Sequence, residues 1–406
     1  MKYVLAVALW IISISGCVSA DRVETDININ IDFSSTTVMG ATCAQLQTVP
    51  AENANRNTKV AYVICDAIKL VQYTHQWLRT DLQEKLGKLN TSKDQQAGIQ
   101  SFVESIKHEL ETTLTKIQVA RSLLQSVEGK ELALIIEPGN WVIDLDGNGE
   151  VSPYEHYFFW IPKRDPITDR SSDQADFYKK NYVNPKIKLD QADILWTIAY
   201  CYFGEFVIHT VLAYDIEKDL KNQLLISPLS IKLVNRNRIS DKAYSSIISG
   251  INYSQKLRQA LLAETDDELE WIASPKQKNT VFPLAMDEQT FTTWGALLEQ
   301  IVAVLEGRVL LGGSVNGAPR SILNNLTFGT CKTDEGINVR ELFSNPLVRP
   351  ILREEELKGR CIKASQSLPF SKIPTLLAKV IARNVGQNRD EMSGEWMMLR
   401  HLYWVN

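Results

Sequence analysis

The chain has 406 residues, of which 44% are hydrophobic and 23% are charged, and this composition excludes a largely disordered protein. Its formal net charge of -4, with no run of Lys and Arg, argues against a nucleic-acid-binding protein, which normally carries a basic face. The length accommodates one large domain or two of ordinary size.

The amino-terminal residues predict a signal peptide over 1–16. The apolar stretch 3–14 holds about a dozen residues, which is short for a membrane helix of about 20. The following Ile14-Ser15-Gly16-Cys17 resembles the lipobox of bacterial lipoproteins. This resemblance implies cleavage before Cys17, lipid on its sulfur and anchoring in the bacterial cell envelope, and Val18 implies the outer membrane. An ordinary cleaved signal peptide followed by a chance cysteine is the alternative.

Residues 17–56 are predicted to be a tether that contains one short strand. Apolar and polar residues alternate there with the period of two that is typical of a half-buried strand. The apolar positions are Ile27, Ile29, Ile31 and Phe33. No adjacent segment offers an equally clear partner strand.

Five cysteines remain if Cys17 carries lipid, and an exported compartment permits disulfides. The simplest pairing joins sequence neighbours, which gives Cys43–Cys65 and Cys331–Cys361. Cys201 lies in an apolar run and is predicted to be a buried thiol. Spacing alone does not determine the connectivity, and five reduced thiols are the alternative.

Two long helices are predicted over 57–89 and 92–128, because apolar residues recur there at helical spacing. Gly129 is the expected residue after the end of the second helix. Joined by a short polar loop, the two helices should form an antiparallel hairpin. We group this hairpin with the motif described below in one region, 57–160.

Residues 161–406 are predicted to be a helical domain, either separate or continuous with the preceding region. Its central helix begins at the N-cap Asp190 and runs to about Leu220. This helix is apolar nearly all round, which predicts burial, and Glu205 and His209 within it disfavour a membrane span. Further helices are expected over 239–264, 288–306 and 371–384, and loops over 273–287 and 312–350.

The fold class is therefore mainly α, with a helical hairpin, a helical bundle around a buried central helix and little β structure. The acidic run from Asp266 to Glu270 is predicted to be the start of a helix with a solvated face.

One segment carries a chemical motif. Residues 144–155 read D-L-D-G-N-G-E-V-S-P-Y-E, which resembles the EF-hand loop at every specified position of that pattern. The resemblance implies Ca²⁺, a hard cation that takes about six to eight oxygen ligands. The implied ligands are the side chains of Asp144, Asp146, Asn148, Ser152 and Glu155 and the backbone carbonyl of Glu150.

The residues after this loop predict a helix, and the residues before it do not. Ser152-Pro153 is a good start for an exiting helix, which would carry residues 154–160. Pro138-Gly139 breaks any entering helix, so an irregular EF-hand-like loop is expected. The sequence contains no second loop of this pattern, and a solitary loop favours a structural brace over a switch.

Glu205 and His209 are the catalytic candidates, since they lie four residues apart on one helical face. A hydrogen-bonded polar pair in the core is the alternative. We therefore expect a calcium-binding, lipid-anchored envelope protein that acts as a binding or structural component. Its partners would be Ca²⁺, the membrane through lipid on Cys17, and another envelope protein. The alternative is an exported, hydrolase-like enzyme with a structural calcium and an active site around Glu205 and His209.

Overall fold

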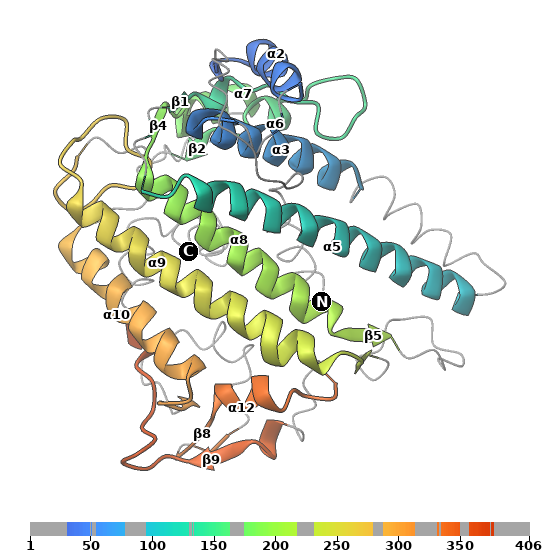
Figure 1. Ribbon diagram of the computed structural model, residues 1–406, viewed down its shortest axis with the longest axis vertical. Coiled ribbons are helices and arrows are strands. Elements are labelled where there is room, and N and C mark those ends of the chain that lie inside the picture. The colour runs from blue at the N-terminus through green and yellow to red at the C-terminus, as the bar shows by residue number, and fades with distance from the viewer. Residues whose placement is uncertain are drawn as a thin grey trace. The chain divides into compact units, whose positions relative to one another are not determined.

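The structure is a computed structural model. It describes residues 31–48, 50, 54–77, 95–129, 132, 134–162, 174–216, 231–278, 287–312, 331–332, 334–349, 357–373 and 375–376. The fold of these residues is mainly α, as predicted, and their strands are only two or three residues long (Figure 1). The predicted signal peptide, Cys17 and most of the predicted tether strand lie outside the described residues.

Contacts between residues divide the chain into two compact units. Unit 1 comprises Met1–Gly87, Glu111–Gly204 and Lys256–Asp287. Unit 2 comprises Lys88–Leu110, Glu205–Gln255 and Glu288–Asn406. Each unit is thus assembled from segments that are far apart in the sequence. The division of the chain into regions 57–160 and 161–406 stays a prediction.

Unit 1 begins with α2 (Thr36–Leu46) and α3 (Arg56–Gln76), which lie side by side (Figure 1). The predicted disulfide Cys43–Cys65 joins the two helices, with Cα atoms 5.7 Å apart. The Tyr62 hydroxyl on α3 also donates a hydrogen bond to the carbonyl of Leu46 at the end of α2. A covalent bond and a hydrogen bond therefore fix α2 on α3.

The second helix of the predicted hairpin is α5 (Gln95–Ser126). The chain leaves it at Gly129, whose φ of +75° is the left-handed conformation expected after a helix end. The ammonium of Lys116 lies 6.0 Å from the ring centroid of Tyr73 on α3, so the two helices meet there. The residues that join them lie outside the described residues.

Short strand pairs interrupt the middle region, where the sequence predicts mainly loops. β1 (Leu134–Ile136) pairs antiparallel with β4 (Ile187–Leu189), and β2 (Ile161–Pro162) pairs antiparallel with β3 (Tyr182–Val183). Helix α7 (Gln174–Asn181) precedes β3 directly. Phe33 forms a parallel bridge with Ile136, so the last residue of the predicted tether strand has a β partner.

The predicted central helix is α8 (Gln191–Leu212), and Asp190 caps it by accepting hydrogen bonds from the N–H groups of Ala192 and Asp193. By length and composition α8 could cross a membrane. Some of its residues are fully buried, for example Ile198, Ala199 and Ile208, as is typical of a core helix.

The predicted end of this helix near Leu220 is wrong. The carbonyl of Ala213 accepts hydrogen bonds from the N–H groups of Val234 and Asn235, so it is not available to continue the helix. The next residues form β5 (Tyr214–Ile216), which pairs antiparallel with β6 (Ile231–Leu233). Pairing with a distant segment therefore ends the helix.

The helices expected near 239–264 and 288–306 are both present, the second of them in unit 2. A π-helical turn, Arg238–Ala243, leads into α9 (Tyr244–Ala263), and α10 spans Glu288–Leu305. α9 contributes residues to both units. The helix predicted over 371–384 is described only up to residue 376, and its described part is helical at 373 and 375–376.

The prediction of a loop over 312–350 is wrong in part. A small antiparallel sheet contains β7 (Leu311–Gly312), β8 (Glu335–Ile337) and β9 (Cys361–Lys363), and α12 (Val339–Ser344) follows β8. A Cβ on Gly336 would lie 3.0 Å from the Cβ of Leu310, so glycine here permits close packing.

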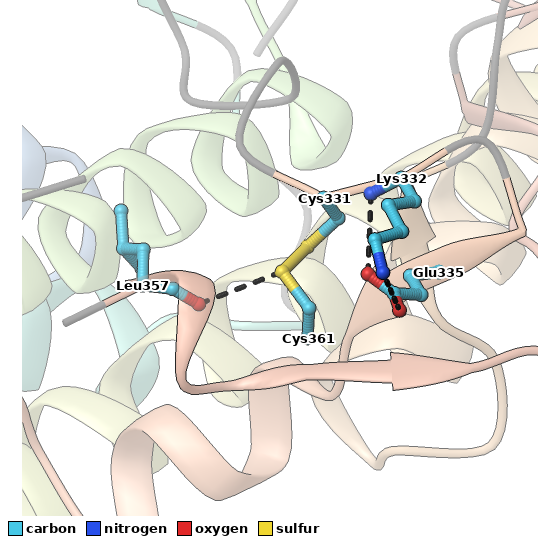
Figure 2. Close-up of a disulfide and its surroundings, with 5 residues drawn as sticks. All are labelled: Cys331, Lys332, Glu335, Leu357 and Cys361. Atoms are coloured by element: carbon cyan, nitrogen blue, oxygen red, sulfur yellow. Dashed lines mark hydrogen bonds and ion pairs between the residues drawn. A yellow bond between two sulfur atoms is a disulfide. The ribbon is translucent and has the colours of Figure 1, made fainter. Parts of the chain in front are cut away.

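The predicted disulfide Cys331–Cys361 ties β9 to the segment before β8, with Cα atoms 5.6 Å apart (Figure 2). Glu335 lies beside it and accepts a hydrogen bond from the backbone N–H of Lys332. Cys201 keeps a buried thiol, as expected. All three predictions for these cysteines are confirmed.

Candidate metal centre

Indole hydrogen bonds hold the chain on both sides of the Asp144–Glu155 loop. Before the loop, a single 3-10 turn (Pro138–Asn140) takes the place of an entering helix, as the sequence predicts. The indole N–H of Trp141 donates to the carbonyl of Phe33 at 2.7 Å. After the loop, the indole N–H of Trp160 donates to the carbonyl of Gly139 at 2.8 Å. These two hydrogen bonds therefore hold the segments on both sides of the loop in place.

The loop folds around the carboxylate of its first residue. Asp144 accepts hydrogen bonds from the backbone N–H groups of Gly147 at 2.6 Å, Asn148 at 3.2 Å and Gly149 at 2.9 Å. Gly147 and Gly149 have φ values of +73° and +86°, in the left-handed region that glycine adopts readily. The two glycines thus let the chain reverse direction around Asp144.

The next alternate residues repeat this local pattern. Asp146 accepts from the N–H of Asn148 at 3.2 Å, and the amide oxygen of Asn148 accepts from the N–H of Glu150 at 2.7 Å. Hydrogen bonds of this kind are typical of Asp and Asn in turns. They hold the side chains at the first, third and fifth places of the loop against its backbone.

Glu155 closes the loop from the other end. One carboxylate oxygen accepts from the N–H groups of Leu145 and Asp146, and the other accepts from the N–H and the hydroxyl of Ser152. Burial raises the pKa of Glu155, which is 2% exposed, but these hydrogen bonds together lower it below its usual range. Glu155 is therefore ionised at neutral pH.

Three carboxylates meet in the loop. Asp144, Asp146 and Glu155 each bring one oxygen to within 4.8 Å of the other two. Like charges at such separations repel one another, and a divalent cation between them would relieve the repulsion. Carboxylate oxygens are also the ligands that Ca²⁺ prefers, so the donor chemistry fits this ion.

The other three ligands implied by the sequence have different surroundings. Asn148 uses its amide oxygen to accept from the N–H of Glu150, and Ser152 hydrogen-bonds Glu155. The side chain of Glu150 is exposed. The structure thus brings the three carboxylates together, with the Ser152 hydroxyl beside Glu155. The roles of Asn148, Ser152 and the backbone carbonyl of Glu150 as ligands stay a prediction.

The predicted exiting helix is only one turn long, which corrects the expectation of a helix over 154–160. α6 (Pro153–His156) begins as predicted, with Ser152 as N-cap and Pro153 in the first turn. The chain then turns, since the N–H groups of Phe158 and Trp160 bond to carbonyls three residues back. This turn packs Tyr157, which is 5% exposed, on Trp160 with ring centroids 4.9 Å apart.

Helix α3 supports the loop from the side. The side-chain amide of Gln72 donates to the carbonyl of Asp144 at 2.9 Å, and the ring centroids of His75 and Tyr154 lie 6.4 Å apart. Several apolar or aromatic side chains remain exposed here. They are Tyr73 on α3, at 44%, and Val151 and Tyr154 on the loop, at 45% and 49%.

The predicted catalytic pair lies in unit 2 and is buried. The hydroxyl of Ser246 donates to Glu205 at 3.4 Å, and a guanidinium nitrogen of Arg238 lies 3.5 Å from Nδ1 of His209. Burial, followed by the charges of Arg238 and Lys242, lowers the pKa of His209 to about 4. His209 is therefore neutral at neutral pH. Sequence spacing gave no signal for Ser246 or Arg238, which come from the next helical segment.

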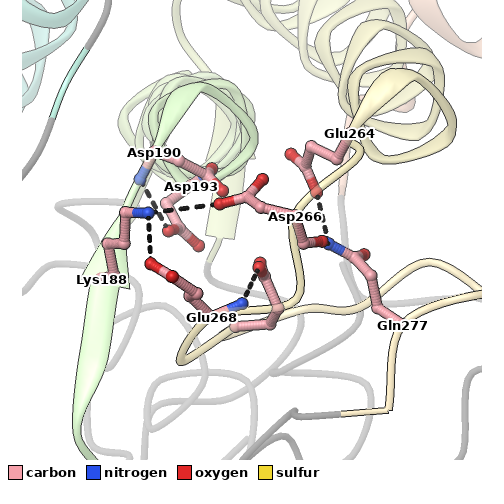
Figure 3. A network of polar contacts seen from close by, with 8 residues as sticks. Lys188, Asp190, Asp193, Glu264, Asp266, Glu268 and Gln277 are labelled. Carbon is pink, nitrogen blue, oxygen red and sulfur yellow. Dashed lines mark hydrogen bonds and ion pairs between the residues drawn. The ribbon is translucent and has the colours of Figure 1, made fainter.

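A second acidic group lies in unit 1, and sequence reasoning missed it. Asp190, Glu264 and Glu270 each bring one oxygen to within 4.8 Å of the other two, and Figure 3 shows the first two of these side chains. The prediction for Asp266–Glu270 is correct in part. Asp266, Asp267 and Glu268 are exposed, as a solvated face requires, but the segment is not helical and Glu270 is 3% exposed. Distance alone would let the three oxygens share a cation or a proton.

Comparison with known proteins identifies no relative. The chain matches no family model, no curated protein and no solved structure. Its function is therefore inferred from the chemistry of its own residues.

Proposed function

We propose that this protein binds one Ca²⁺ ion in the Asp144–Glu155 loop, as a structural brace in a lipid-anchored component of the bacterial cell envelope. The main support is the approach of Asp144, Asp146 and Glu155, whose carboxylate oxygens lie within 4.8 Å of one another. Calcium suits this loop better than magnesium, because Mg²⁺ demands near-ideal octahedral geometry and gives up its waters reluctantly. We expect a dissociation constant of about 10⁻⁵–10⁻³ M, as in extracellular modules.

The flanks of the loop favour a brace over a switch. In calcium sensors, the ion changes the angle between two helices that flank the loop. Here a 3-10 turn precedes the loop and a one-turn helix follows it, and two indoles fix both sides. An ion in this loop would therefore stabilise the fold and would have no helix pair to open.

The surface beside the loop favours a binding component over an enzyme. Val151 and Tyr154 are 45% and 49% exposed, and aromatic side chains are common where proteins meet a partner. Glu205 and His209 instead have protein partners in the core. The support for the lipid anchor is the sequence Ile14-Ser15-Gly16-Cys17 alone.

Terbium luminescence tests the site directly, because Tb³⁺ replaces Ca²⁺ and is excited through nearby aromatic rings such as Trp141 and Tyr157. We expect Tb³⁺ emission that Ca²⁺ suppresses by competition. Glu155→Gln should weaken Tb³⁺ binding at least about tenfold, since it replaces a charged ligand. Glu150→Gln, in the same loop, should bind as the wild type does. No emission from the wild type, or equal loss in both variants, would contradict the proposal.

A hydrolase-like enzyme is the second candidate, and the contact of Ser246 with Glu205 is the observation in its favour. A group with a pKa of about 4, as His209 has, is a weak general base at neutral pH. If an active site lay here, the protein would hydrolyse a small activated ester, and Ser246→Ala and Glu205→Gln would each abolish the hydrolysis. Unchanged hydrolysis in both variants would remove this candidate.

A further inference from the structure

The second acidic group joins two parts of unit 1 that are separate in the sequence. Asp190 and Asp193 lie at the start of α8, Glu264 follows the end of α9, and Glu270 lies six residues further along the chain. Asp193 and Glu270 are buried, at 7% and 3% exposure. Figure 3 shows Asp190, Asp193 and Glu264 between α8 and the chain that follows α9.

Three carboxylates so close together, of which Glu270 is buried and Asp190 and Glu264 are half-buried, disfavour one another's ionisation. Two carboxylates that share a site raise the pKa of one of them, and burial adds a further cost to each charge. Asp190, Glu264 and Glu270 lie within 4.8 Å of one another, so full ionisation would place three negative charges in one small volume. The folded arrangement is therefore compatible with protonated carboxyls that bridge their neighbours, and ionisation would drive the groups apart.

We propose that Asp190, Asp193, Glu264 and Glu270 form a proton-operated latch. The latch holds the segment Glu264–Lys278 against the start of α8 at acidic pH and releases it as the pH rises.

Other charged groups around the latch are already engaged. Lys188 on β4 pairs with Asp266 at 3.2 Å and with Glu268 at 3.0 Å, at the exposed side of the group (Figure 3). Asp267 accepts from the backbone N–H of Lys278. The side-chain amide of Gln277 contacts Glu264 at 3.4 Å and the carbonyl of Asp266 at 2.9 Å. The positive charge of Lys188 acts on Asp190, and its ammonium already pairs with Asp266 and Glu268.

The backbone of the segment is strained where it turns. Leu269 has a φ of +58°, in the left-handed region that residues other than glycine rarely adopt. Its carbonyl accepts a hydrogen bond from the N–H of Lys188 at 3.1 Å, and its neighbour Glu270 points into the carboxyl cluster. A strained turn needs the surrounding contacts to persist, so loss of the latch would favour its release.

The pKa values of the cluster support this direction. Burial, followed by the charges of Asp190 and Glu270, raises the pKa of Glu264 to about 8. Burial, followed by the charge of Asp190, raises that of Glu270 to about 7. Burial and Asp190 also raise the pKa of Asp193, and burial raises that of Asp190.

A raised pKa means that the closed state binds the proton more tightly than the open state does. The contribution of Glu264 is therefore complete below its ordinary value of 4.5 and is lost as the pH rises through about 8. The contribution of Glu270 is lost as the pH rises through about 7. The latch should thus open between mildly acidic and mildly alkaline pH.

Amide hydrogen exchange of the full chain tests the latch, with EDTA present to remove divalent cations. After correction for the intrinsic pH dependence of exchange, protection of residues 264–278 should fall at least about tenfold between about pH 5 and about pH 9. Glu264→Gln and Asp193→Asn, which are neutral at every pH, should each weaken this pH dependence. Asp176→Asn, an exposed carboxylate on α7, should leave it unchanged.

Three results would overturn the latch. They are equal protection at both pH values in the wild type, an unaltered pH dependence in both Glu264→Gln and Asp193→Asn, and recovery of protection at alkaline pH when Ca²⁺ or Mg²⁺ replaces EDTA in Glu155→Gln, whose calcium loop is weakened. The last result would mean that the group takes a cation in place of protons.

Discussion

The carboxylate of Glu155 lies 2.8 Å from the backbone nitrogen of Leu145, so the last residue of the loop is hydrogen-bonded to its second residue. The side chain of Leu145 is completely buried. The same carboxylate also holds Ser152 at the start of α6. One side chain therefore connects the loop closure, the core and the exiting turn.

This connection predicts a stability effect at acidic pH. The pKa of Glu155 lies below its ordinary value of 4.5, because its hydrogen bonds outweigh its burial. Its contribution to stability is therefore present above 4.5 and is lost as the pH falls through the lowered value. Urea unfolding of Glu155→Gln across acidic pH should show a flatter loss of stability than the wild type.

At neutral pH the free energy of unfolding of Glu155→Gln should be about 1–3 kcal/mol lower than that of the wild type, because an amide N–H would face the donors on Ser152. Glu150→Gln, whose side chain is exposed, should follow the wild-type curve. Parallel curves for Glu155→Gln and the wild type would contradict the role assigned to this carboxylate.

Two glycines provide a matched test of backbone conformation. A Cβ on Gly149 or on Gly40 would meet no atom within 4 Å, so neither substitution creates a clash. Gly149 has a φ of +86°, so Gly149→Ala should lower the free energy of unfolding, measured in urea, by about 1–2 kcal/mol. Gly40 lies inside α2, where Gly40→Ala should stabilise by about 0.5–1 kcal/mol. Effects of the same sign in both variants would contradict the left-handed turn at Gly149.

The two disulfides should contribute similarly to stability. Cys43–Cys65 closes 22 residues and Cys331–Cys361 closes 30. Loss of either bridge, by paired substitution to alanine, should cost about 3 kcal/mol in chain entropy. Because Cys65 lies on α3, which also carries Gln72, loss of the first bridge should weaken Ca²⁺ binding in a calorimetric titration as well. Loss of the second bridge should leave Ca²⁺ affinity unchanged, and equal weakening by both would contradict this coupling.

Local signals predicted much of the helical structure. The N-cap Asp190, the glycine that follows α5 at Gly129 and the start of α10 all act within a few residues, so they are visible in sequence. β5 and the β7-β8-β9 sheet were missed because each depends on pairing between distant segments. Short strands of two or three residues carry too little periodicity to reveal such pairs.

For a similar reason, the sequence revealed the first acidic group and did not reveal the second. The Asp144–Glu155 loop is contiguous, and the spacing of its residues reflects the geometry of one turn. The latch brings the start of α8 to the chain after α9, and only the fold shows that Glu270 is buried. Charge alone predicted a solvated face over Asp266–Glu270, which is correct for Asp266, Asp267 and Glu268 and wrong for Glu270.

Thermal melting with and without millimolar Ca²⁺ tests the central claim most directly. For the wild type, Ca²⁺ should raise the melting temperature, because an ion that binds only the folded state stabilises it by mass action. Glu155→Gln should lose most of this increase, and Glu150→Gln should keep it. A wild-type melting temperature that does not change with Ca²⁺ would contradict the proposal that calcium braces this protein.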